Sequence, residues 1–320
     1  MAQSNPYTLQ NVKLVCFTVV AGILLTVWQL IDGCIPLPMQ LVFLMVSLLL
    51  TGIPHGALDH LVQQEQSRRQ QGRFRLMLFL GRYVAIMLLY ALAWYVFPQL
   101  SLSFFLLISC WHFGETDISL MPQTPVLTAL LRLLYGISVL VWILLPHQFE
   151  VSPILLHMVT RNGLIYSHWT AIASNSSWLI PASSMVILVA SIVTAFIRQG
   201  NRYCYWLRLQ LVVVLLCGYA LPLLPAFALY FAGWHSLITL FNIKGFITDG
   251  NTTHNKPLLI LWLKALPFSL IAITGLVAAG YSFRRYAPLF DPLPLLFVFL
   301  SLITLPHMEV MHKLNSSVPG

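Results

Sequence analysis

The chain contains very little charge for its length. Only 8% of its 320 residues are Asp, Glu, Lys or Arg, whereas soluble domains carry roughly 25% charged residues. A water-soluble fold could not bury the 58% of residues that are hydrophobic, so the composition indicates a protein that crosses a membrane several times. The net charge of +8 does not indicate nucleic-acid binding, because the basic residues are spread thinly between apolar segments.

Recognisable cysteine patterns are also missing. The five cysteines show no C-x-x-C spacing and mostly fall inside apolar runs, which argues against a metal cluster or a disulfide framework. No soluble domain, linker or low-complexity stretch separates the apolar segments. Residues 1–320 are therefore expected to form a single membrane-embedded helical domain.

Long apolar runs are abundant. A spanning helix needs about 20 mainly apolar residues, and the sequence predicts an all-α bundle of about 8–10 such helices in a polytopic membrane protein. The expected spans are residues 14–31, 37–53, 76–97, 100–118, 127–146, 178–197, 207–224, 226–246, 258–280 and 292–310. A turn is predicted at 32–36, and the mixed polar and aromatic stretch 147–170 is expected to form an interfacial helix.

The basic residues are distributed unequally between the predicted loops. With ten spans, the side that carries both termini collects fourteen Lys and Arg residues, and the other side collects three. Because short basic loops remain in the cytoplasm, we expect a cell-membrane protein with both termini cytoplasmic.

Four histidine-containing motifs interrupt this apolar background. They are TGIPHGALDH with His55, CWHFGETD with His112, AGWHSL with His235 and LPHMEVMH with His307. All four lie on even-numbered predicted spans that run inward, so their imidazoles can converge in the inner leaflet. A polar side chain inside a bilayer usually faces the bundle interior, and neutral imidazole is the commonest metal ligand. We predict one metal site, and several His with few carboxylates favour iron.

Two carboxylates lie close to these histidines in the sequence. Glu115 follows His112 by three residues and so shares its helix face, and Asp59 follows His55 by four. Either pair could orient a ligating imidazole. Asp117, slightly beyond Glu115, is an alternative partner.

Two further histidines and two tryptophans complete the candidate residues. His60 and His312 lie five residues beyond a motif histidine, so they point around the helix from it. Each either supports or ligates the metal, or lies at the cytoplasmic interface. Trp111 and Trp234 precede motif histidines and are expected to pack beside a substrate channel.

The motifs PHGALDH, WHFGETD, WHS and LPHM, in this order, resemble the Brp/Blh family of integral-membrane β-carotene 15,15'-dioxygenases. The resemblance implies a His-bound non-haem Fe(II) site, with His55, His112 and His235 on the family's iron positions and His307 on its PHM motif. It implies that O₂ splits the central double bond of β-carotene into two retinal molecules. The expected partners are O₂, a polyene from the bilayer, membrane lipids and a rhodopsin that receives the retinal; no nucleic acid is expected.

One position departs from the family pattern. The third motif usually reads H-S-x-x-H, but Thr239 stands where the second His is expected. His307, His312 or a water could compensate for the missing nitrogen. The alternatives are a divergent member that acts on another carotenoid or lipid, and a membrane binding or transport protein without catalysis.

Overall fold

The computed structural model describes residues 9–118, 125–159, 163–197, 202–248, 258–286 and 292–316. Within these ranges the chain is helical and forms no strand, which confirms the predicted all-α class. The helices, of which η1 and η2 are π-helical, are α1 (Leu9–Asp32), α2 (Leu37–Ser47), η1 (Leu48–Gly52), α3 (Pro54–Ala57), α4 (Asp59–Arg69), α5 (Leu76–Val96), α6 (Pro98–Asp117), α7 (Pro125–Leu144), α8 (Gln148–Met158), α9 (Leu164–Ser174), α10 (Ser176–Ile197), α11 (Arg202–Ala220), α12 (Leu223–Ala228), η2 (Leu229–Ser236), α13 (Leu237–Thr248), α14 (Leu258–Tyr286) and α15 (Pro292–Ser316).

Nine of the ten predicted spans correspond to helical segments of the described chain that are long and apolar enough to cross a membrane. Two of these segments are composite: Leu37–Arg69 includes α2, η1, α3 and α4, and Leu223–Thr248 includes α12, η2 and α13. The remaining predicted span, residues 100–118, is also a helix, α6, but it does not meet the same criterion. Its polar C-terminal half, which carries one of the motif histidines, lowers its hydropathy.

Prolines and a glycine set several helix boundaries. Pro54 and Pro98 are the first residues of α3 and α6, where a missing N–H breaks no helical hydrogen bond. The predicted turn at 32–36 is present, and Gly33 adopts a φ of 72° there, which suits glycine. The stretch 147–170 forms parts of two helices, α8 and α9, instead of one; residues 160–162 lie outside the described chain.

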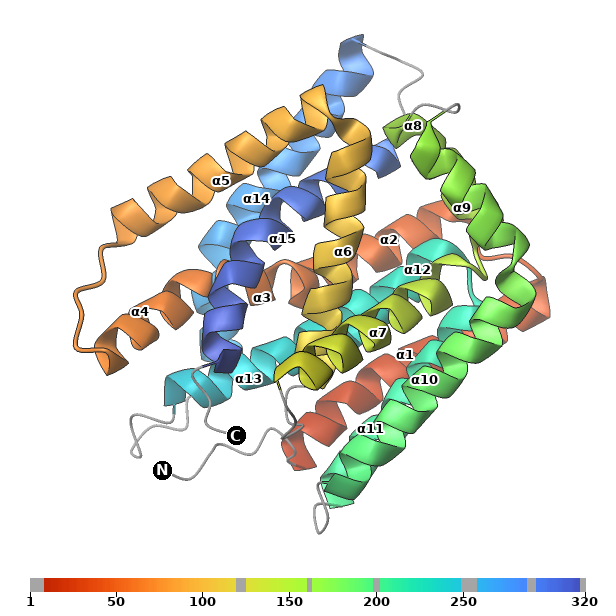
Figure 1. The fold of residues 1–320 in the computed structure, drawn as a ribbon, viewed down its shortest axis with the longest axis horizontal. Helices are drawn as coiled ribbons and strands as arrows, with labels where there is room; N and C mark the ends of the chain where they lie inside the picture. The colour runs from red at the N-terminus through yellow and green to blue at the C-terminus, as the bar shows by residue number, and fades with distance from the viewer. Residues whose placement is uncertain are drawn as a thin grey trace.

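Two apolar cores flank the centre of the bundle. In Figure 1, α1, α7, α10 and α11 lie on one side of the molecule, and α5 and α14 lie on the other. Buried residues of α1, α6, α7, α11 and η2 form one core, and those of α2, η1, α12 and α15 form another. The four motif histidines are carried by α3, α6, η2 and α15, which therefore meet between these two cores.

Two glycines allow α6 and α7 to approach closely. A Cβ atom on Gly114 would overlap the backbone of Arg132, and one on Gly136 would overlap the backbone of Cys110. Small residues at such crossings are the usual means by which membrane helices pack backbone to backbone. The contact fixes α6, and with it His112, against the first core.

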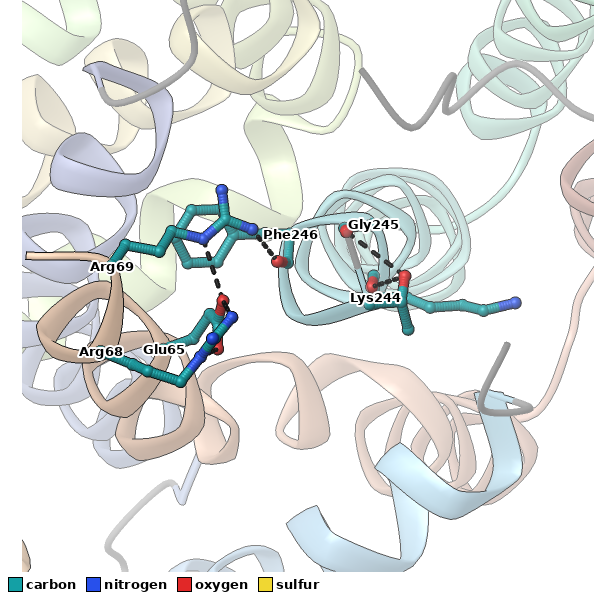
Figure 2. A network of polar contacts seen from close by, with 7 residues as sticks. Glu65, Arg68, Arg69, Lys244, Gly245 and Phe246 are labelled. Carbon is teal, nitrogen blue, oxygen red and sulfur yellow. Dashed lines mark hydrogen bonds and ion pairs between the residues drawn. The ribbon is translucent and has the colours of Figure 1, made fainter. Parts of the chain in front are cut away.

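The polar end of α4 is fastened to α13. Glu65 accepts hydrogen bonds from Arg68 and Arg69, and Arg69 also donates to the carbonyl of Phe246. Figure 2 shows Arg69 extending over the Phe246 ring, with its guanidinium carbon 4.2 Å from the ring centroid. This connection holds together the two helices that continue from the His55 and His235 motifs.

Candidate metal centre

Both π-helical segments of the described chain adjoin a motif histidine. The segment η1 ends two residues before α3, which carries His55, and η2 contains His235. The hydroxyl of Thr51 in η1 donates to the carbonyl of Ala232 in η2 over 2.9 Å. π-Helical turns are rare and occur frequently at functional sites. Here they bring two histidines that are 180 residues apart in the sequence to one place.

The four motif histidines form a closed ring of imidazoles. The ring centroids of His55 and His307 lie 4.8 Å apart, those of His307 and His112 5.1 Å, those of His112 and His235 4.8 Å, and those of His235 and His55 5.7 Å. Neighbouring planes are close to perpendicular, with interplanar angles of 77–89°. The structure therefore brings together the four side chains that the sequence singled out.

Ring nitrogens at this centre are buried and lack partners. Both nitrogens of His112, both of His235 and Nε2 of His307 have no hydrogen-bond partner among the residues that the structure describes. A buried polar atom without a partner costs about 1–3 kcal/mol. One ring nitrogen from each of His55, His112 and His307 lies within 4.8 Å of the other two, and His235 stands beside this trio. The donor set fits a metal ion that prefers imidazole nitrogen.

A carboxylate orients one of these rings. Oδ1 of Asp59 accepts a hydrogen bond from Nδ1 of His307 over 2.8 Å, and Oδ2 of Asp59 accepts one from Tyr83 over 3.1 Å. With its proton on Nδ1, His307 presents the Nε2 lone pair to the centre. The proposed pairing of Asp59 with His55 is thus wrong. Nδ1 of His55 instead lies 3.4 Å from the carbonyl of Thr51.

The expected pairing of Glu115 with His112 is not found either. Oε1 of Glu115 lies 2.8 Å from Nδ1 of His312 and 3.7 Å from Arg132. A helix turn places residues three apart on one face but does not make their side chains bond, and here Glu115 turns towards α15. The contact between Glu115 and His312 joins α6 to α15. The side chain of His312 is 55% exposed, so it lies outside the buried ring of imidazoles.

His60 and Thr239 also bond away from the centre. Nδ1 of His60 lies 3.0 Å from the carbonyl of Ala57, and its ring packs on Phe268. Thr239 is fully buried, and its hydroxyl donates to the carbonyl of His235 over 2.9 Å. His307 provides the fourth imidazole of the ring.

Asp117 is the centre of a second buried polar cluster. Its carboxylate accepts hydrogen bonds from the hydroxyls of Tyr135 and Tyr230 and from the indole of Trp234. The cluster connects the end of α6 to α7 and to η2. Asp117 therefore holds Trp234, the residue before His235 in η2, and no hydrogen bond joins it to an imidazole among the described residues.

A cavity opens beside the imidazole ring. It has a volume of about 60 Å³ and is lined by His55, His112, His307 and mainly apolar side chains. Its aromatic lining comes from Phe105, Phe113, Phe227 and Phe231. Trp111 and Trp234 are not among the lining residues; Trp111 packs near His312, and its ring centroid is 6.5 Å from that imidazole.

Comparison with known proteins identifies the family. A family model described as "Beta-carotene 15,15'-dioxygenase" matches residues 46–315, a region that contains all four ring histidines. The chain belongs to this family. A curated "Beta-carotene 15,15'-dioxygenase" from uncultured marine bacterium 66A03 is 29% identical over 185 residues, which cover 58% of this chain and 62% of the relative. The match thus spans about six-tenths of that relative's length. No solved structure matches the chain.

Within this dioxygenase family member, sequence reasoning missed Tyr83, Thr51 and the phenylalanines of the cavity. Tyr83 follows Arg82 inside an apolar run, and this polar pair was the available signal. The phenylalanines gave no signal, because they are indistinguishable in sequence from other apolar residues of the spans. Their place at the cavity follows only from the packing of α6, α12, η2 and α15.

Proposed function

We propose that the protein is a membrane oxygenase that holds Fe(II) with His55, His112, His235 and His307. It cleaves the central double bond of β-carotene with O₂ and forms two molecules of retinal. The observation that carries this proposal is the ring of four buried imidazoles with partnerless nitrogens, in a chain of the β-carotene 15,15'-dioxygenase family.

The protein's own residues prepare the donor atoms. Asp59 keeps the proton of His307 on Nδ1, so that Nε2 is free to coordinate. Within the part of the chain that the structure describes, no hydrogen bond occupies either ring nitrogen of His112 or His235, so each ring has a lone pair to offer a metal. When bound, non-haem iron supplies the activation of O₂ that amino-acid side chains cannot provide.

The apolar cavity is suited to a hydrocarbon. Phe105, Phe227 and Phe231 line it beside the histidines and exclude water from the reacting bond. In this proposal O₂ and the reacting double bond meet in this cavity, beside the histidines that line it, and the ends of the polyene extend towards the bilayer. We assign substrate contact to these phenylalanines in place of Trp111 and Trp234.

The reaction is balanced without an external reductant. One carbon–carbon double bond and the O₂ bond break, and each oxygen atom forms the carbonyl of one retinal. Retinal is apolar enough to leave through the lipid and to reach a rhodopsin in the same membrane. From the excess of basic residues in the predicted loops on one side, we infer that both termini lie in the cytoplasm.

Expression in cells that produce β-carotene tests the activity. The expected result is loss of β-carotene and appearance of retinal by chromatography, with stoichiometric iron in the purified protein. H112A is expected to lose iron and retinal together. H157A, in an exposed histidine of α8, is the matched control and is expected to keep both.

The outcomes separate the parts of the proposal. An active protein that contains no iron contradicts the metal assignment. An iron-loaded protein that leaves β-carotene intact contradicts the substrate and favours another carotenoid or lipid. Activity that is independent of O₂ contradicts the dioxygenase reaction itself.

A further inference from the structure

A second and larger cavity lies away from the imidazole ring. Its volume is about 310 Å³, which is within the range of ligand-binding pockets. Residues of α4, the connection 70–75, α5 and α15 line it. In Figure 1, α4 and α5 lie on the opposite side of the bundle from α10 and α11, and α15 runs through the middle of the view.

The charge of this cavity is strongly unbalanced. Four basic residues, Arg73, Arg75, Arg82 and Lys313, line it together with a single acidic residue, Glu309. The carboxylate of Glu309 already pairs with Arg82 and Lys313, each over 2.7 Å. Arg73 and Arg75 are exposed and line the cavity. Among the described residues, no ion pair joins either of them to a carboxylate.

The rest of the lining is apolar. Leu78, Phe79, Ile86 and Val310 provide hydrocarbon surface next to the basic side chains. The cavity lies where the charged connection meets the first turns of α5, and a charged connection next to an apolar span is expected at the membrane surface. An anionic head with an apolar tail matches both halves of this lining.

We propose that this cavity binds an anionic phospholipid, with the phosphate on Arg73 and Arg75 and an acyl chain along α5 and α15. Basic pockets between membrane helices on the cytoplasmic side bind anionic lipid head groups. The positive charge of the connection agrees with that side. A bound lipid would also cover Tyr83, which lines the cavity and donates to Asp59, the partner of His307.

The test compares lipids added to the purified full-length protein in detergent. A ligand that binds only the folded state raises the unfolding temperature. Phosphatidylglycerol is expected to raise it, and phosphatidylcholine and inorganic phosphate are not. R73Q/R75Q is expected to bind phosphatidylglycerol roughly 10- to 30-fold more weakly, as estimated from the loss of two basic charges near a lipid head group.

The control removes the same charge elsewhere. Arg284 and Arg285, at the end of α14, are exposed and do not line the cavity. R284Q/R285Q is expected to respond to phosphatidylglycerol like the unmodified protein. An equal loss in both double variants would show attraction by bulk charge and overturn the proposal. So would a full response of R73Q/R75Q, or an equal response to inorganic phosphate, which would identify a free anion as the ligand.

Discussion

Asp59 and His307 are 248 residues apart in the sequence and are joined by a 2.8 Å hydrogen bond between Oδ1 and Nδ1. The bond connects α4 to α15 and is almost fully buried, with side-chain exposures of 3% and 4%. It determines which nitrogen of His307 faces the centre. The other nitrogen has no partner among the described residues, so the tautomer of this histidine, and with it the proposed metal binding, depends on Asp59.

Replacement of Asp59 by Asn is expected to weaken metal binding. An amide can donate to Nδ1 and so stabilise the tautomer with the proton on Nε2, which removes the lone pair from the centre. Loss of such an orienting carboxylate typically costs 10–100-fold in metal affinity. The measurement is a competition titration of D59N against a chelator, with circular dichroism to verify folding.

The Y83F variant serves as its control. It removes the hydroxyl that donates to Oδ2 of Asp59 and leaves the bond to His307 in place. Its metal affinity is expected to fall much less than that of D59N. Equal losses in the two variants would mean that Asp59 acts by holding α5 and not by setting the tautomer.

The sequence predicted the helices and the four ring histidines, because each depends on local information. Apolar runs of spanning length define the helices, and His55, His112, His235 and His307 stand out as polar residues inside them. The expectation that these residues converge rested on the alternating direction of the predicted spans. The family motifs carry the same four residues.

The partners of these histidines could not be predicted in the same way. Asp59 was paired with His55 and Glu115 with His112 because sequence spacing reports only neighbours on one helix. In the structure both carboxylates bond to α15, to His307 and His312 respectively. Such choices depend on the crossing of distant helices, which no local pattern encodes.

Replacement of Gly136 by Ala is expected to separate α6 from α7. The added methyl group would overlap the backbone of Cys110, which cannot move aside as a side-chain end can. Overpacking of this kind typically costs 1–3 kcal/mol. G275A is the matched control on α14, because a Cβ there meets nothing within 4 Å. Thermal unfolding in detergent is expected to show a loss for G136A and none for G275A.

Replacement of Asp117 by Asn is expected to destabilise the centre through η2. Tyr135, Tyr230 and Trp234 all donate to this carboxylate, and an amide has one acceptor oxygen fewer, so a buried donor loses its partner. The expected cost is about 1–3 kcal/mol. Y135F, which removes a single donor, is expected to lose less, about 1 kcal/mol. Similar stabilities for D117N and the unmodified protein would contradict this role.

Replacement of Thr239 by Val tests whether the residue at the family's missing histidine takes part in metal binding. Its hydroxyl donates to the carbonyl of His235, one turn earlier, and points along the helix. Val keeps the shape and removes the hydroxyl, so stability is expected to change by no more than about 1 kcal/mol. The iron content of T239V is expected to equal that of the unmodified protein, whereas H235A is expected to lose iron. A loss of iron in T239V would show that the hydroxyl coordinates the metal and that four imidazoles are insufficient to hold it.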